Sequence, residues 1–276
     1  MRSYKNAMNN RDSMDDFCRG VLGLLQSREI EFLVGGYNAL HYYTGVQRDT
    51  KDLDLMVRPS DIVEVLNLCR SAGYGIQLAY SHWLAKIESD AYFVDVIFNS
   101  GNGICVVDDD WFARSQTSLV LDVSVKIVPL EELIWQKAYI MERERFDGAD
   151  IAHLLFASAD RVDWEHLIAR FGPDWRVLLS HLILFGFIYP SKRDTIPAKV
   201  MDELLHLLES ERNTPSPTTN LCNGTLLSRN QFISDIELAS LLDARLSERS
   251  VMTPEEIKAW TLAGEIEQHK SARMQG

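Results

Sequence analysis

The sequence has few cysteines, no long apolar run and no recognisable targeting segment. Its four cysteines lie far apart without a C-x-x-C pair, which argues against a thiolate zinc site and a disulfide framework. The longest apolar stretch, residues 177–189, is shorter than the roughly 20 residues that a membrane-spanning helix needs. Residues 1–16 lack the apolar centre and cleavage site of a secretory signal, so we expect a cytoplasmic protein without membrane contact.

Positive charge and the common catalytic signatures are also scarce. The 28 Lys and Arg residues face 40 Asp and Glu residues, which gives a net charge of −12. Such a charge repels a polyanion unless the basic side chains gather on one face, so general nucleic-acid binding is disfavoured. The sequence has no H-E-x-x-H, no G-x-S-x-G and no P-loop with its lysine. These common signatures therefore assign no function to the chain.

The spacing of apolar residues divides the chain into a mixed half and a helical half. Up to residue 128, short strand-like segments alternate with helix-like ones, whereas helical periodicity dominates after Pro129. This pattern predicts an α+β fold, a mixed sheet with flanking helices followed by a helical domain. The expected parts are a mixed domain over 1–128, a helical domain over 129–212, a linker over 213–230 and a helical C-terminal tail over 231–276.

Several individual elements are expected within these parts. Strands are expected at residues 52–57 and 92–98, and a further short strand at 104–107. Residues 232–246 are expected to be helical. Because residues 224–245 carry more apolar side chains than a solvated tail would, we expect this segment to fold back onto the protein.

Three aspartates stand out in two of the expected strands. Asp52 and Asp54 are two residues apart and therefore share one face of their strand, while the leucines between and after them face the core. Asp95 lies alone among six apolar neighbours, where an unpaired carboxylate is costly. If the strands are neighbours, each pair of carboxylates near 4 Å repels by about 4 kcal/mol at an effective dielectric of 20. Hard divalent cations, Mg²⁺ or Mn²⁺, would relieve that repulsion.

A glycine pair precedes the acidic strand. Gly35 and Gly36 close an expected strand and open an expected helix, a place where backbone N–H groups and the positive helix end can approach a phosphate. Arg48 and Thr50 lie between this turn and the acidic strand, and their guanidinium and hydroxyl groups could bind a phosphate. Gly-Gly or D-x-D alone is weak evidence, because D-x-D is commonly a solvated strand edge. The ordered combination favours nucleotide chemistry.

These residues resemble the polymerase-β-type nucleotidyltransferase superfamily over residues 32–98. The signature of that superfamily is a Gly-Gly or Gly-Ser turn, a D-x-D strand and a third Asp on the adjacent strand. The resemblance implies that Gly35 and Gly36 hold the nucleotide phosphates and that Asp52 and Asp54 bind both metal ions. It also implies that Asp95 binds the catalytic metal and helps to activate the acceptor hydroxyl. Residues 1–128 would then be the catalytic domain and 129–212 the acceptor-side domain.

One residue departs from the pattern, and a second resemblance extends it. Tyr37 stands where many relatives have a serine, which removes a hydroxyl that would touch the terminal phosphates. Further along, residues 128–150 resemble the segment after the catalytic core in toxin-type nucleotidyltransferases of abortive-infection systems. There a lysine on a helix and a following aspartate complete the site, which implies nucleotide contacts for Lys137 and Asp150. Lys137 could equally extend from an apolar helix face, and Asp150 could equally cap the next helix.

The residues and the resemblances together predict a metal-dependent enzyme that moves a nucleoside monophosphate from an NTP to an acceptor and releases pyrophosphate. The acceptor stays open between a small hydroxylated molecule, an RNA end and a protein side chain, and the toxin resemblance adds an antitoxin partner. The rival hypothesis is a catalytically inactive nucleotide-binding or toxin–antitoxin interaction module on the same fold. It ranks second because the sequence retains all three aspartates.

Overall fold

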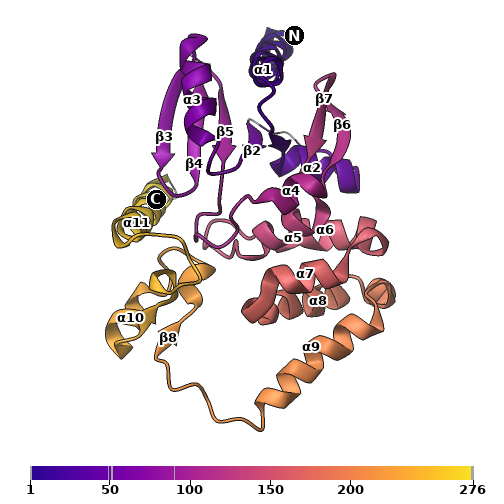
Figure 1. Cartoon of the computed structure of the whole chain (residues 1–276), viewed down its shortest axis with the longest axis vertical. Helices are drawn as coiled ribbons and strands as arrows, with labels where there is room; N and C mark the ends of the chain where they lie inside the picture. The colour runs from indigo at the N-terminus through magenta and orange to yellow at the C-terminus, as the bar shows by residue number, and fades with distance from the viewer. Residues whose placement is uncertain (1, 49, 51, 90, 275–276) are drawn as a thin grey trace. The chain divides into compact units, whose positions relative to one another are not determined.

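The computed structural model describes residues 2–48, 50, 52–89 and 91–274, and the last two residues of the expected tail lie outside them. The chain divides into two compact units (Figure 1). The first comprises Met1–Ser100 and Val106–Pro129, and the second comprises Gly101–Cys105 and Leu130–Gly276.

The first unit is built on a mixed sheet. Within the described residues, the sheet has seven strands in the order β3-β4-β5-β2-β1-β7-β6. The strands are β1 (Leu33–Val34), β2 (Leu53–Met56), β3 (Gly75–Tyr80), β4 (Leu84–Glu88), β5 (Phe93–Ile97), β6 (Gln116–Val120) and β7 (Val123–Ile127). Strand β2 is parallel to β5, and β1 is parallel to β7, whereas the other neighbouring strands are antiparallel. The two acidic strands of the sequence are therefore neighbours near the middle of the sheet.

Apolar side chains of the central strands form the core of this unit. Leu53 and Leu55 of β2 and Val94 and Val96 of β5 are buried, as their alternation with the aspartates predicts. Helices α1 (Arg2–Ser27), α2 (Gly36–Thr44), α3 (Ile62–Ser71) and α4 (Asp109–Ala113) accompany the sheet. Helix α2 contacts β2, and α3 contacts β3. The strand expected at 104–107 does not form, and these residues have no regular structure.

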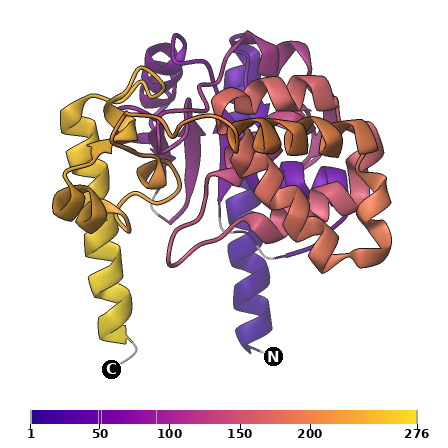
Figure 2. The same cartoon turned by 90° about the horizontal axis from the view of Figure 1, so that it is seen from below.

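The second unit is dominated by helices. They are α5 (Leu130–Ala138), α6 (Gly148–Ser158), α7 (Trp164–Phe171), α8 (Trp175–Ile188), α9 (Ala198–Glu211), α10 (Ile233–Ala239) and α11 (Pro254–Met274). Helices α5 to α9 pack together in Figures 1 and 2. Helix α8 carries the longest apolar stretch of the chain, yet no helix among the described residues is long and apolar enough to cross a membrane.

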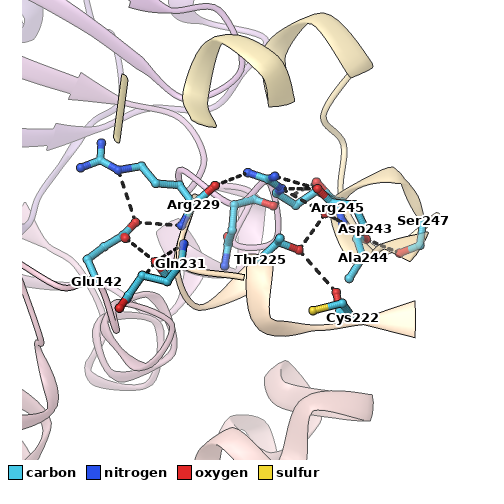
Figure 3. Close-up of polar contacts among 12 residues, drawn as sticks. Glu142, Cys222, Thr225, Arg229, Gln231, Asp243, Ala244, Arg245 and Ser247 are labelled. Atoms are coloured by element: carbon cyan, nitrogen blue, oxygen red, sulfur yellow. Dashed lines mark hydrogen bonds and ion pairs between the residues drawn. The ribbon is translucent and has the colours of Figure 1, made fainter. Parts of the chain in front are cut away.

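The C-terminal segment of the second unit folds back as expected, but it contacts the loop after α5 through polar groups (Figure 3). Of its apolar side chains over 224–245, Leu226 and Ala244 are buried whereas Leu238 and Leu242 are exposed. Residues 213–220 are exposed, but 221–230 form the short strand β8 (Leu221–Cys222) and a buried turn. Glu142 accepts hydrogen bonds from the Ser228 hydroxyl at 2.6 Å and the Arg229 backbone N–H at 3.1 Å. Buried Arg245 donates to Asp243 and to the Arg229 carbonyl oxygen. The expected helix over 232–246 is shortened to α10, which ends at a left-handed Ser240.

Glu142→Ala is expected to loosen this segment without unfolding the rest of the protein. Hydrogen bonds to a charged group contribute about 1.5–3 kcal/mol each, so losing them should raise the population of the open segment roughly tenfold or more. Limited trypsin digestion followed by mass spectrometry should show faster cleavage after Arg229 and Arg245. Glu144→Ala, which removes an exposed carboxylate nearby, is the matched control. Equal cleavage rates for both variants would mean that Glu142 does not hold the segment.

Candidate active site around three aspartates

Two of the three aspartates lie directly opposite one another. The parallel register of β2 and β5 pairs Asp54 with Asp95, and Asp52 immediately precedes β2. Burial raises the pKa of the Asp95 carboxyl, the Lys86 ammonium opposes that change, and the negative charge of Asp52 adds to it. Asp52 is therefore near enough to act on Asp95 electrostatically. The condition set by the sequence, that the two acidic strands are neighbours, is met, and it places Asp54 beside Asp95.

The glycine turn lies against Asp54. Gly35 closes β1 and precedes α2, and its backbone N–H donates to the Asp54 carbonyl oxygen at 2.9 Å. Gly36 has a φ of +53°, and a Cβ atom built there would overlap the Asp54 carboxylate. Glycine is therefore needed at residue 36 both for its backbone conformation and for the space that the carboxylate takes. The turn and the acidic strand form one local site.

Gly36→Ala is expected to displace the Asp54 carboxylate and to lower turnover by about 10²-fold, the loss that a misplacement of roughly 1 Å can cause. Gly45→Ala is the matched control, because Gly45 at the end of α2 also has a positive φ of +69° but its Cβ would meet no atom within 4 Å. Both variants carry the backbone strain, of about 1–2 kcal/mol. Steady-state kinetics beside thermal unfolding should separate them. Similar activities would show that the clash with Asp54 is relieved without consequence.

The residues between the turn and the acidic strand are held by local contacts. The Thr50 hydroxyl donates to Asp52 Oδ1 at 2.9 Å. The Arg48 backbone N–H donates to the Tyr37 hydroxyl at 3.2 Å, and the Arg48 guanidinium lies 5.8 Å from the centroid of the Tyr37 ring. Tyr37, the departure from the superfamily pattern, thus supports the loop that carries Arg48. Arg48 itself is exposed.

A lysine that the sequence analysis did not single out contacts the site. Lys86 of β4 pairs in register with Asp95, and its ammonium donates to Asp95 Oδ1. The same ammonium lies 4.0 Å from the centroid of the Phe93 ring. A polar residue inside an apolar strand was the available signal, but only the sheet order shows that β4 and β5 are neighbours.

The donor atoms suit a hard divalent cation. Among the residues that the structure describes, no three His, Cys, Asp or Glu side chains already surround a common cation position. One carboxylate oxygen of Asp52 accepts a hydrogen bond from Thr50, and one carboxylate oxygen of Asp95 accepts a hydrogen bond from Lys86. Carboxylate oxygens are nevertheless the ligands that Mg²⁺ and Mn²⁺ prefer, and Asp54 and Asp95 are opposed on adjacent strands. The set fits such a cation provided that Lys86 releases Asp95.

Lys137 and Asp150 lie together in the second unit. The Lys137 ammonium donates to Asp150 Oδ2 at 2.6 Å and to Asp147 Oδ2 at 2.8 Å, and all three residues are buried. Burial favours a higher pKa for Asp147, but the Arg145 guanidinium and the Lys137 ammonium lower it to about 2. Asp147 precedes α6 and Asp150 lies in its first turn. The structure thus joins these two predicted residues through ion pairs that the sequence did not specify.

The comparison with protein families matches just over half of the chain. A family described as "Nucleotidyl transferase of unknown function (DUF2204)" matches residues 15–157. No curated protein sequence matches significantly. The antibiotic-resistance factor ANT(2'')-Ia is 17% identical, covering 62% of this chain and 97% of that chain at a TM-score of 0.41.

Two further solved structures have comparably low sequence identity and TM-scores. The lincosamide antibiotic adenylyltransferase LnuA is 17% identical, covering 51% of this chain and 96% of that chain at a TM-score of 0.38. JHP933 from Helicobacter pylori is 12% identical, covering 96% of this chain and 97% of that chain at a TM-score of 0.35. Similarities this distant carry no inference about the substrate of this chain.

Proposed function

The chain belongs to the nucleotidyl transferase family that matches its residues 15–157, and we propose that it moves a nucleoside monophosphate from an NTP to an acceptor hydroxyl. In that reaction the acceptor oxygen bonds to the α-phosphorus, the bond from the α-phosphorus to the bridging oxygen breaks, and pyrophosphate leaves. The observation that carries the proposal is the pair of opposed carboxylates, Asp54 and Asp95, with Gly36 packed against the first.

Each residue has a proposed task. Gly35 and Gly36, at the start of α2, hold the nucleotide phosphates, and the donor is the Gly36 backbone N–H, because that of Gly35 is hydrogen-bonded to the Asp54 carbonyl oxygen. Asp52, Asp54 and Asp95 hold Mg²⁺ or Mn²⁺, which when bound stabilises the charge on the attacking and leaving oxygens. Asp95 accepts the proton of the acceptor hydroxyl. Arg48 and Thr50 complete the phosphate side of the site in this proposal.

The acceptor we propose is a small, cationic, hydroxylated molecule. The net charge of −12 attracts such a molecule and repels RNA. An RNA acceptor would be held through its phosphates, so that transfer would weaken steeply with salt. Transfer to an RNA end or to a protein side chain, with growth inhibition and an antitoxin partner, is the alternative that the toxin resemblance supports. Transfer onto purified tRNA at physiological salt would overturn the small-molecule proposal.

A second candidate function is a nucleotide-binding module without turnover. The specific observation in its favour is the Lys86 ammonium on Asp95, because a bound ammonium neutralises one of the three carboxylates. A thermal-shift screen of the four NTPs with and without Mg²⁺ shows whether the protein binds a nucleotide, which both candidate functions require. A saturating ligand at 100 times its Kd stabilises the protein by about 2.7 kcal/mol. Nucleotide binding without Mg²⁺-dependent pyrophosphate release would favour the module.

A further inference from the structure

Lys86 contacts the carboxylate site, and the function proposed above gives it no task. The antiparallel register of β4 and β5 places it opposite Asp95, and its ammonium donates to Asp95 Oδ1. The ring of Phe93 lies against the same ammonium. The Lys86 and Asp95 side chains are 22% and 15% exposed, so water screens this ion pair only partly. The Lys86–Asp95 attraction is therefore stronger than that of a fully exposed ion pair.

The Lys86 ammonium offsets part of the carboxylate repulsion at this site. Asp54 faces Asp95 across the parallel strands, and Asp52 acts on Asp95 electrostatically. Their mutual repulsion opposes folding, and a positive charge on Asp95 offsets it. The same contact occupies a carboxylate oxygen that a divalent cation would use. An ammonium and a divalent cation thus compete for Asp95.

We propose that Lys86 is a built-in counter-ion of this site, which neutralises Asp95 until a divalent cation displaces the ammonium. The proposal rests on the proposed function, because it takes Asp95 to be a cation ligand. Lys86 is then a positioning residue that weakens cation binding to the free enzyme. Nucleotide phosphates add negative charge and oxygen ligands, so the cation enters chiefly together with the NTP. The enzyme would avoid holding a cation when no nucleotide is present.

Binding of Mn²⁺ alone, measured from the free-ion signal in electron paramagnetic resonance, tests this proposal without any turnover. Lys86→Met should lower the Kd for Mn²⁺ by roughly tenfold or more, because the competing ammonium is gone. Lys126→Met is the matched control. Lys126 is also a strand lysine of the first unit in an ion pair, with Glu31 at 2.7 Å, but its partner is not one of the three aspartates. Its Kd should equal that of the wild type.

Lys86→Arg keeps the test decisive if Lys86→Met folds poorly. A guanidinium can grip a carboxylate through two parallel hydrogen bonds, so this variant should bind Mn²⁺ more weakly than the wild type. A Lys86→Met protein that folds only when Mn²⁺ is added would also support the proposal. Wild-type affinity in both Lys86 variants, with weaker binding in Asp54→Asn, would overturn the role of Lys86 alone. Equal binding by the wild type and Asp54→Asn would remove the proposed metal site and the Lys86 proposal with it.

Discussion

Asp54→Asn is expected to lower the rate of nucleotidyl transfer by at least about 10²–10³-fold, the range for losing one preorganised electrostatic contact at a reacting centre. The asparagine side chain has nearly the same size as the aspartate and still fits beside Gly36. It lacks the negative charge that lies opposite Asp95. Pyrophosphate release with Mg²⁺ and each NTP measures the effect. The variant should still fold, because removing one of two opposed carboxylates relieves repulsion.

Asp202→Asn is the matched control for this change. It removes the same charge from an exposed position of α9. We expect its rate and its melting temperature to equal those of the wild type. The melting temperature of Asp54→Asn should be unchanged or higher, since active-site charges commonly cost stability. A fully active Asp54→Asn enzyme would show that the carboxylate pair is not the reacting centre.

Lys137→Met is expected to lower the free energy of unfolding by about 3–5 kcal/mol, the usual cost of removing one partner from a buried ion pair. The Lys137 ammonium lies between the carboxylates of Asp147 and Asp150, and its side chain is only 6% exposed. Urea unfolding of both proteins measures the loss. Lys199→Met is the control, because Lys199 forms an exposed ion pair with Glu165 at 3.3 Å, which should contribute at most about 1 kcal/mol.

The pH dependence of the Lys137→Met effect follows from Asp147. The pKa of this carboxyl lies at about 2 in the folded protein, below its ordinary value of 3.8. A group with a lowered pKa stabilises the folded state above its unfolded pKa, and that stability is lost as pH falls toward the folded pKa. The Arg145 guanidinium, which also lowers this pKa, stays in the variant, so the stability gap between wild type and Lys137→Met should be full at pH 7 and should shrink only in part between about pH 4 and pH 2. A stable variant that has lost only NTP affinity would assign Lys137 to the triphosphate instead.

Much of the first unit was predictable because its strands carry strong local patterns. Strands β2 and β5 each place an aspartate between buried apolar residues, so their alternation fixes which face is core. Gly45, in a left-handed conformation, ends α2, as glycines commonly end helices. The nucleotidyltransferase resemblance drawn from the turn and the aspartates is confirmed by the family match.

Other elements were missed for identifiable physical reasons. Strand β6 pairs with β7 through a two-residue turn in which Leu121 and Asp122 both have positive φ. Such turns usually contain Asn-Gly or Asp-Gly, and the sequence Leu-Asp does not predict one. Leu119 in β6 is 71% exposed, so that strand lacks a buried face at that position. The helix expected over 232–246 breaks at Ser240, a residue with no strong tendency to stop a helix.

The ion pairs of the site depend on tertiary pairing that a single sequence does not contain. Lys86 meets Asp95 because β4 is hydrogen-bonded to β5, and strand order is not encoded in the local pattern of either strand. Lys137 reaches Asp147 and Asp150 because α5 packs on α6. The roles of Arg48, Thr50, Lys137 and Asp150 toward a nucleotide stay predictions.

The position of the transferred label distinguishes transfer of a nucleoside monophosphate from transfer of the terminal phosphate. The enzyme, Mg²⁺ and a mixture of small hydroxylated cations should be incubated in parallel with NTP labelled at the α-phosphate and with NTP labelled at the γ-phosphate. We expect an acceptor to acquire the α-label and the γ-label to appear only in pyrophosphate, with no transfer by Asp54→Asn. An acceptor that carries the γ-label, or α-label transfer that Asp54→Asn catalyses equally well, would contradict this expectation.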